Sequence, residues 1–177
     1  MEHDAGAIPG IGFFGGRMSK EKILVSACLL GEPVRYDGKS MPNEAVISLG
    51  ERFELVAVCP ECLGGLPTPR TPSEIDESTG CLRVVTADGE DRTDAFVAGA
   101  RACVSIAQEM GCKLAILKSN SPSCGSGKIY DGTFSGGLIA GNGVTTRLLT
   151  SAGVWVISEN DVESGFPTVE FDDFRRL

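Results

Sequence analysis

The sequence predicts a single α/β domain with a mainly parallel sheet flanked by helices in a Rossmann-like three-layer arrangement. Short apolar runs without polar alternation indicate strands that are buried on both faces. These runs alternate with helical segments, an order that produces parallel strands joined by crossover helices. The 177 residues, of which 42% are hydrophobic and 23% charged, suffice for one globular core but are few for two.

Four apolar runs are the expected strands of this sheet. They cover residues 22–28, 53–59, 113–117 and 153–157. Ile and Val are frequent in these runs, and β-branched residues favour strands. A further run at residues 81–86 is followed by Asp88-Gly89, a turn signal, and is expected to form a small peripheral hairpin.

Helices are expected between these strands. A short helix is predicted over residues 43–50, with Asn43 as its N-cap and Gly50 as its C-cap. A long helix is predicted over residues 91–111, because its apolar residues recur at spacings of three and four. The remaining helical segments are residues 144–152 and a short segment that begins near residue 158.

Residues 1–19 are expected to form a flexible N-terminal extension or tag, since they are rich in Gly and lack a hydrophobic period. Residues 20–177 then form the domain. The extension lacks the basic region of a secretory signal, and no apolar run approaches the ~20 residues that span a bilayer. The net charge of −8 argues against long nucleic acid or a membrane as partner. A cytoplasmic location is expected.

Cysteine usage points to metal binding or thiol chemistry. The chain has 7 Cys and 1 His, and that histidine, His3, lies in the N-terminal extension. A reducing compartment disfavours a disulfide framework. Without a histidine in the folded domain, a Ser–His or Cys–His catalytic pair is excluded, and so is a histidine-rich zinc site.

Cys28, Cys59 and Cys124 follow three of the predicted strands. Ligands of α/β sheets bind outside the carboxyl ends of the strands, and neighbouring strands lie about 4.8 Å apart. The three thiols can therefore converge on one site. Thiolates without histidine suit zinc or an iron–sulfur cluster. Because such a cluster is normally held by four cysteines, three would leave one iron open as a Lewis acid.

Other interpretations of the cysteines remain. A free cysteine often packs as a small hydrophobic residue, which is the preferred interpretation of Cys81, Cys103 and Cys112. Cys59 and Cys62 also form a CxxC pattern, which is typical of a redox pair or of half a zinc site. The redox motif requires its first cysteine at a helix N-terminus, whereas repeated Gly and Pro follow here. No second CxxC completes a four-cysteine zinc site.

Glu61 lies two residues from Cys59, and beside a metal centre it would be suited to act as a general base. A surface carboxylate or a backbone cap is an equally good interpretation from the sequence alone. The same loops contain other polar residues: Asp37, Arg70, Lys118, Ser119, Asn120, Ser121 and Ser123.

Four blocks of this sequence closely resemble the bacterial thiouracil desulfidases, a family formerly known as a domain of unknown function. The blocks are SACLLGEPVRYDG (residues 26–38), CPECLGGLPTPRTPSEI (59–75), LKSNSPSCGSGKIYDGTFSG (117–136) and GNGVTTRLL (141–149). They occur in the same order and extend over about residues 22–159. Four ordered blocks are far more specific than any single motif.

The resemblance implies a non-redox enzyme that converts a thiolated pyrimidine (thiouracil, thiouridine or its nucleotide) to the oxo form and releases sulfide. Members hold a 4Fe–4S cluster with three cysteines, which match Cys28, Cys59 and Cys124. The glutamate of the family's CPE motif matches Glu61 as the base. Ser121 is expected to take part in catalysis. The residues expected to bind substrate are Asp37, Ser119, Asn120 and Ser123.

The chain departs from many relatives at two positions. Val34 stands where many have cysteine, and Cys62 stands where many have an aliphatic residue. A thiol at Cys62 could close the open iron and prevent catalysis. The alternative function is therefore a non-catalytic module that binds zinc or senses the state of an iron–sulfur cluster.

Overall fold

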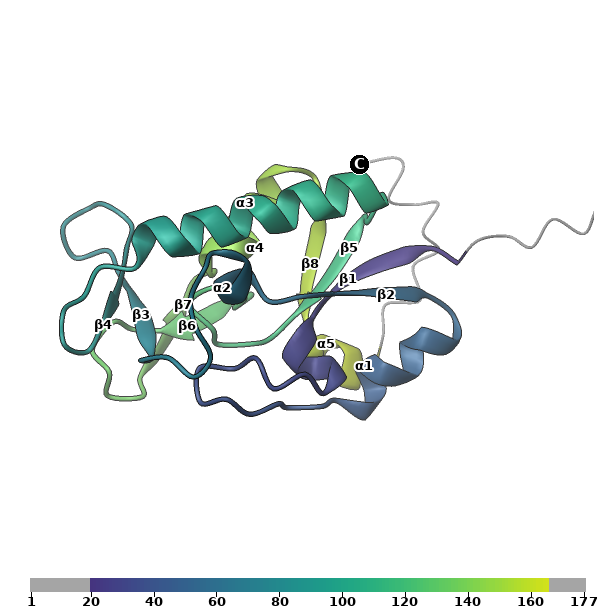
Figure 1. Ribbon diagram of the computed structural model, residues 1–177, viewed down its shortest axis with the longest axis horizontal. Helices are drawn as coiled ribbons and strands as arrows, with labels where there is room; N and C mark the ends of the chain where they lie inside the picture. Colours follow the sequence, from purple (N-terminus) through teal and green to yellow (C-terminus); the bar gives the residue numbers. More distant parts are fainter. Residues whose placement is uncertain (1–19, 166–177) are drawn as a thin grey trace, which may run out of the picture.

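A parallel sheet forms the centre of the molecule in the computed structural model, which describes residues 20–165 (Figure 1). The strands in spatial order are β2 (Glu54–Val58), β1 (Lys22–Ser26), β5 (Leu114–Leu117) and β8 (Trp155–Ser158). All three neighbouring pairs are parallel, with Ser26 opposite Val58 and Leu117 opposite Ser158 at the carboxyl ends. The four strands predicted from the sequence are these four.

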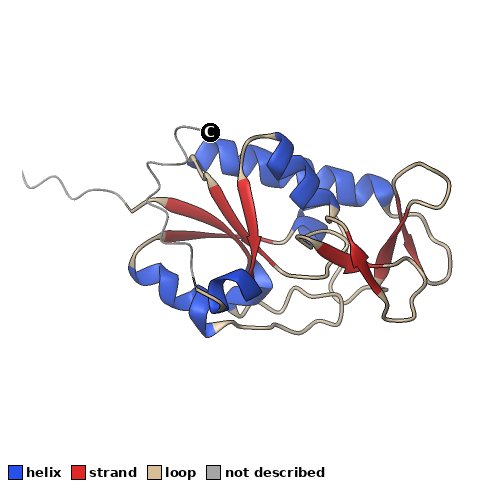
Figure 2. Ribbon diagram, turned by 180° about the vertical axis from the view of Figure 1, so that it is seen from behind, coloured by secondary structure: helices blue, strands red, loops and turns tan. Residues whose placement is uncertain are grey.

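Helices cover both faces of the sheet, as the three-layer prediction requires. Figures 1 and 2 show α3 (Thr93–Met110) and α4 (Val144–Ser151) on one face, and α1 (Glu44–Ser48) and α5 (Glu159–Glu163) on the other. Alternate residues of β1 enter separate cores: Ile23 packs with Val46 of α1, whereas Leu24 packs with Cys103 of α3. This two-sided burial explains why the strand sequences lack polar alternation.

Helix ends agree with most of the capping signals. The Asn43 side chain accepts a hydrogen bond from the Val46 N–H at 3.0 Å, as an N-cap does. Gly111 ends α3 in the left-handed conformation at φ 71°. Gly50 does not end α1, because a 3-10 turn, η2 (Leu49–Glu51), continues the chain past it.

Two short helices lie in segments that were predicted as the end of a strand and as a loop. The expected first strand ends at Ser26, and a 3-10 helix, η1 (Ala27–Leu30), carries Cys28. The loop after β2 begins with α2 (Pro60–Leu63), a single helical turn. One turn is too short to produce an apolar periodicity, which explains why the sequence pattern missed both.

Two hairpins extend the molecule beyond the sheet. The predicted strand at residues 81–86 is β4 (Arg83–Thr86), and it pairs with β3 (Ser73–Asp76), which precedes it. A second hairpin, which was not predicted, joins β6 (Lys128–Tyr130) to β7 (Leu138–Ala140). Its strands have three residues each, and all of β7 is exposed, so no alternation marks it.

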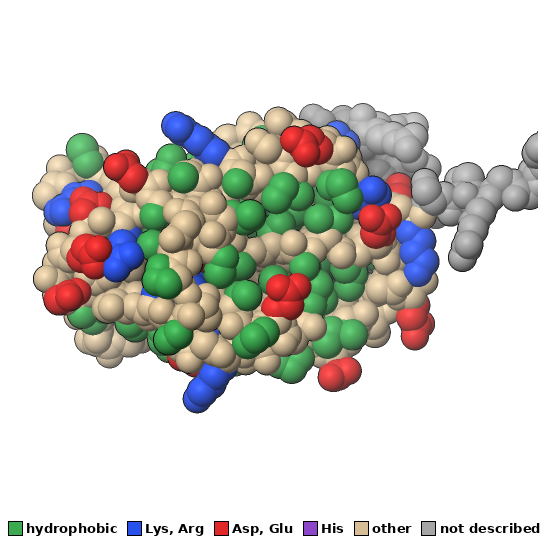
Figure 3. Space-filling model, in the orientation of Figure 1, with side chains coloured by type: hydrophobic (Ala, Val, Ile, Leu, Met, Phe, Trp, Pro, Cys, Tyr) green, Lys and Arg blue, Asp and Glu red, His purple; other side chains and the backbone are tan. Residues whose placement is uncertain are grey.

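On the face drawn in Figure 3, apolar side chains gather over β2, which is an edge strand, and over the adjoining part of α3. Among the helices of residues 20–165, none has the length and apolar character needed to cross a membrane. The predicted extension at residues 1–19 lies outside the described residues.

Candidate functional site

The three predicted ligand cysteines follow three adjacent strands. Cys28 comes directly after β1, Cys59 directly after β2, and Cys124 lies in the loop that follows β5. All three are free thiols; Cys28 and Cys124 are buried, and Cys59 is half-buried. The parallel order of the strands therefore brings the three segments to one edge of the sheet, as predicted.

The expected convergence of the three thiols is incomplete. Within residues 20–165, no three Cys, His, Asp or Glu side chains lie close enough together to hold a metal ion. Electrostatic interactions connect some of the thiols: the charge of Cys28 acts on Cys124, and that of Cys62 acts on Cys59. Strand order sets the shared edge, but the loops set the final distances. The ligand set stays a prediction.

Burial dominates the ionisation of these thiols. It raises the pKa of Cys124 well above its ordinary value, although a hydrogen bond from Ser26 Oγ to Cys124 Sγ at 3.5 Å acts in the opposite direction. Burial also raises the pKa of Cys28, while the nearby charges of Lys118 and Arg35 lower it. A buried thiol ionises readily only beside a cation or a metal.

Hydrogen bonds fix the loop that carries Cys124. Ser121 Oγ accepts bonds from the backbone N–H groups of Ser123 and Cys124, each at 3.1 Å. Thr146 Oγ1 donates to the carbonyl of Cys124 at 2.9 Å. Ser121, the predicted second catalytic residue, thus shapes the turn through its acceptor oxygen and keeps its proton available for another partner.

Ser123, which was predicted to bind substrate, is buried. Its side chain is 0% exposed, and its hydroxyl lies 3.0 Å from the Thr145 hydroxyl, which is equally buried. A hydroxyl enclosed in this way is satisfied inside the protein, and its contact with substrate stays a prediction. Ser123 therefore anchors the loop to the start of α4.

A buried carboxylate that the sequence analysis missed stands at the same edge. Glu159, 6% exposed, follows β8 and accepts from Lys118 Nζ at 2.5 Å. It also accepts from the backbone N–H of Ser119 at 2.7 Å and from its hydroxyl at 2.8 Å. Ser119, predicted to bind substrate, is thereby engaged with Glu159. A signal was available, because Glu159 lies two residues after the fourth predicted strand, which ends at residue 157.

Glu61 lies in α2 and is held by Arg70. Arg70 Nε donates to Glu61 Oε2 at 2.6 Å, and the guanidinium also donates to the carbonyl of Val34 at 3.0 Å. The Arg70 side chain is only 4% exposed and that of Glu61 17%. Arg70 Nε binds one carboxylate oxygen of Glu61, whose side chain is partly exposed. The arrangement is suited to a fixed general base.

Asp37 and Asn120, the other predicted substrate residues, stay accessible in half-buried positions. Asp37 accepts a hydrogen bond from the backbone N–H of Lys39 at 3.1 Å. The turn that contains Asp37 is joined to the loop after α2, because the Arg70 N–H donates to the carbonyl of Tyr36 at 2.8 Å. Asn120 adopts a left-handed conformation at φ 61°. Asn and Asp tolerate that conformation better than bulkier residues do. Their contact with substrate stays a prediction.

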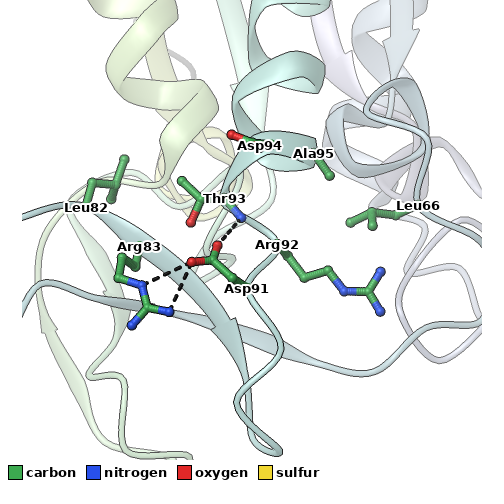
Figure 4. Close-up of a pocket in the computed structure, with 8 residues that line it drawn as sticks. All are labelled: Leu66, Leu82, Arg83, Asp91, Arg92, Thr93, Asp94 and Ala95. Carbon is green, nitrogen blue, oxygen red and sulfur yellow. Dashed lines mark hydrogen bonds and ion pairs between the residues drawn. The ribbon is translucent and has the colours of Figure 1, made fainter.

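A separate hollow of about 520 Å³ lies at the start of α3, as Figure 4 shows. Its lining residues are Leu66, Leu82, Arg83, Asp91, Arg92, Thr93, Asp94 and Ala95. None of the predicted site residues lines it. Its polar groups largely bond one another: Arg83 pairs with Asp91 at 3.0 Å, and Asp91 accepts from the Thr93 N–H at 2.9 Å.

The α/β fold described above is shared with a solved relative of this chain. The uncharacterized protein YbbK of Bacillus subtilis (strain 168) is 48% identical over 146 residues, which cover 79% of this chain and 97% of that protein. A solved structure of the 4Fe-4S-dependent thiouracil desulfidase TudS matches with a TM-score of 0.74 and 47% sequence identity, covering 82% of this chain and 95% of that chain. Residues 23–161 match the family described as 2-thiouracil desulfurase. The chain belongs to the 2-thiouracil desulfurase family.

Proposed function

We propose that this protein is an iron–sulfur-dependent desulfidase that hydrolyses a thiolated pyrimidine to its oxo form and releases sulfide. The observation that carries the proposal is the placement of Cys28, Cys59 and Cys124 after three adjacent parallel strands, beside the Glu61–Arg70 pair. Similarity to the thiouracil desulfidase TudS supports the same substrate class. Thiouracil, thiouridine and its nucleotide are the candidates.

The donor set suits a 4Fe–4S cluster. Thiolates are the ligands that iron–sulfur clusters use, and Cys28, Cys59 and Cys124 are unpaired thiols at one edge of the sheet. Bringing them together requires side-chain rotation or loop movement, since they form no ready group of three in residues 20–165. When bound, a cluster held by three cysteines supplies an open iron that attracts sulfur as a Lewis acid.

Glu61 is the proposed general base. Arg70 holds its Oε2 atom, and Oε1 is proposed to accept the proton of the attacking water. A water that loses its proton to Oε1 attacks the thiocarbonyl carbon; the carbon gains oxygen from water and loses its sulfur as hydrogen sulfide. No electrons are exchanged in this balance. Base catalysis of this kind contributes roughly 10²–10⁴-fold to a rate.

The remaining polar residues divide into two groups. Ser121, Asn120 and Asp37 are accessible and are proposed to orient the pyrimidine. Lys118, Ser119 and Glu159 bond one another and are proposed to hold the loop in place. The chain's own contribution is therefore orientation of substrate and transfer of one proton.

Anaerobic reconstitution with iron and sulfide tests the proposal, followed by the absorbance of 2-thiouracil and 4-thiouridine monophosphate. Cys28→Ala, Cys59→Ala and Cys124→Ala should each abolish cluster binding and turnover. Glu61→Gln should keep the cluster and reduce turnover about 100-fold or more. Cys81→Ala, at an exposed thiol far along the chain from the site, is the matched control. Cluster-independent turnover in the three ligand variants would contradict the proposal.

The second candidate is a non-catalytic module that binds zinc or senses a cluster. One observation favours it: Cys62 lies beside Cys59 and offers a fourth thiol. Metal analysis separates the candidates, because zinc protein is colourless and iron–sulfur protein is brown. Bound zinc together with no turnover of either thiolated substrate would favour the module.

A further inference from the structure

The first turn of α2 carries a pair of cysteines in a redox-motif geometry. Cys59 is the N-cap of the helix, Pro60 opens it, and Cys62 is its third residue. Side chains at the N-cap and at the third helical position face each other, as they do in a capping box. The sequence disfavoured a redox pair because Gly and Pro follow; the structure removes that objection.

The two thiols are neighbours on this turn, at the N-cap and at the third helical position of α2, and the charge of Cys62 acts on Cys59. Each thiol also makes a further polar contact: Cys59 Sγ donates to the carbonyl of Val34 at 3.7 Å, and Cys62 Sγ lies 3.5 Å from Thr68 Oγ1. Both are free and half-buried, so a small oxidant can reach them.

Close backbone packing holds this turn in place. A Cβ on Gly99 of α3 would lie 1.8 Å from the carbonyl oxygen of Pro60, and one on Gly64 would lie 2.0 Å from that of Ala95. Only glycine permits this approach of α2 to α3. The relative positions of Cys59 and Cys62 are therefore built into the packing of the two helices.

We propose that Cys59 and Cys62 form a reversible disulfide in the cluster-free protein, and that this disulfide withdraws Cys59 from the metal-ligand set. The withdrawal rests on the proposed function, whereas the disulfide does not. The oxidant is a low-molecular-weight disulfide. Exchange with one thiol gives a mixed disulfide and releases one small thiol, and the second cysteine then displaces the other. The protein loses two electrons and two protons, which the oxidant takes up.

The other cysteines are less suited to this chemistry. The charge of Cys59 acts on Cys103, but Cys103 is 0% exposed, and Cys112 is 3% exposed. Cys81 is exposed in the connection between β3 and β4. Because Cys81 is accessible to the oxidant but has no cysteine partner in a CxxC pattern, Cys81→Ala serves as the matched control.

Mass spectrometry tests the disulfide directly. The cluster-free protein is treated with oxidised glutathione, and the remaining free thiols are blocked with iodoacetamide. Tryptic cleavage after Arg52 and Arg70 yields the peptide of residues 53–70, whose only cysteines are Cys59 and Cys62. The expected peptide is unalkylated and about 2 Da lighter than the dithiol form, from the loss of two hydrogens. A peptide with both cysteines alkylated, or carrying glutathione alone, overturns the proposal.

Cluster loading tests the withdrawal. Oxidised protein should take up less than about a tenth of the iron that the reduced protein binds, and dithiothreitol should restore loading. Cys62→Ala should load equally with and without oxidation, whereas Cys81→Ala should behave like the parent protein. Equal loading of the disulfide form overturns the withdrawal. Failure of the reduced protein to bind a cluster contradicts the proposed function instead, and leaves the mass measurement intact.

Discussion

Two arginine–glutamate pairs of this protein have the same length and different surroundings. Arg70–Glu61 at the sheet edge and Arg147–Glu77 near the β3–β4 hairpin both measure 2.6 Å. The side chains of the first pair are 4% and 17% exposed, and those of the second 33% and 48%. Exposed pairs contribute roughly 0–1 kcal/mol, whereas removing one partner from a buried pair is strongly destabilising. Burial, rather than distance, identifies the pair that positions a functional group.

The same contrast separates Lys118–Glu159 from Arg83–Asp91. The buried pair also binds Ser119, through both its N–H and its hydroxyl, and so organises a loop at the candidate site. The pair at the hollow of Figure 4 has side chains 42% and 47% exposed and fixes only its local turn. Helix α3 begins beside that hollow. Helix α2, which carries Glu61, packs against α3.

The largest expected effect comes from removing the support of the buried Arg70–Glu61 pair. Gly99→Val places a side chain where the carbonyl of Pro60 lies 1.8 Å away, so α2 must move. We expect the free energy of unfolding to fall by about 3 kcal/mol or more, measured by urea denaturation. Ala98→Val, at an exposed position of the same helix, should cost less than about 1 kcal/mol. Equal losses in the two variants would contradict the close-packing argument.

Glu159→Gln breaks the second buried pair. It leaves the Lys118 ammonium, 19% exposed, without its carboxylate. We expect a loss of about 2 kcal/mol in the free energy of unfolding, since a partly buried charge is left uncompensated. The control is Glu77→Gln, which removes an exposed pair and should change stability by about 0.5 kcal/mol. The contrast fails if the exposed pair proves as costly to remove as the buried one.

Arg70→Lys tests position rather than charge. A lysine keeps the positive charge but cannot donate at once to Glu61, the Val34 carbonyl and Thr68, as the guanidinium does. We expect kcat of the reconstituted protein to fall about 10-fold while KM changes little. The pH profile of kcat should also shift. Arg147→Lys should leave turnover as it is, and a drop in that variant would remove the distinction between the two pairs.

The smallest effect is expected at the exposed hairpin and depends on pH. Hydrogen bonds from Thr93, followed by the Arg83 side chain, lower the pKa of Asp91 to about 2. The folded carboxyl has the lower pKa, so its stabilisation is present above pH about 4 and is lost as pH falls toward about 2. Asp91→Asn should therefore lower Tm slightly at neutral pH and converge with the parent at low pH. A constant difference across this range would exclude the titration as its cause.

Strong, repeated patterns in the sequence predicted most of the fold. Runs of β-branched residues without alternation identified the four strands, and the spacing of apolar residues identified α3. Short elements escaped, because α2, β6 and β7 have too few residues to show a period. The sequence predicted the small hairpin that contains β4 but did not identify its partner strand β3, which has only four residues.

The candidate site was predicted in part. Strand order and cysteine position placed Cys28, Cys59 and Cys124 at one edge of the sheet. Glu61 lies at the same edge, in the helix that follows Cys59. Ser123 was assigned to substrate from the family resemblance, and its side chain is completely buried. Glu159 was missed because an acidic residue in the first turn of a helix is common and needs no special partner.

The strand set, the long helix and the chemistry of the donors follow from local periodicity and residue type, which can be read along the chain. Which polar groups act together depends instead on tertiary packing. Glu159 meets Lys118 across 41 positions of the chain, and Gly99 meets Pro60 across two helices. Such contacts depend on how separate elements pack, and packing is a property of the assembled core that no local pattern records.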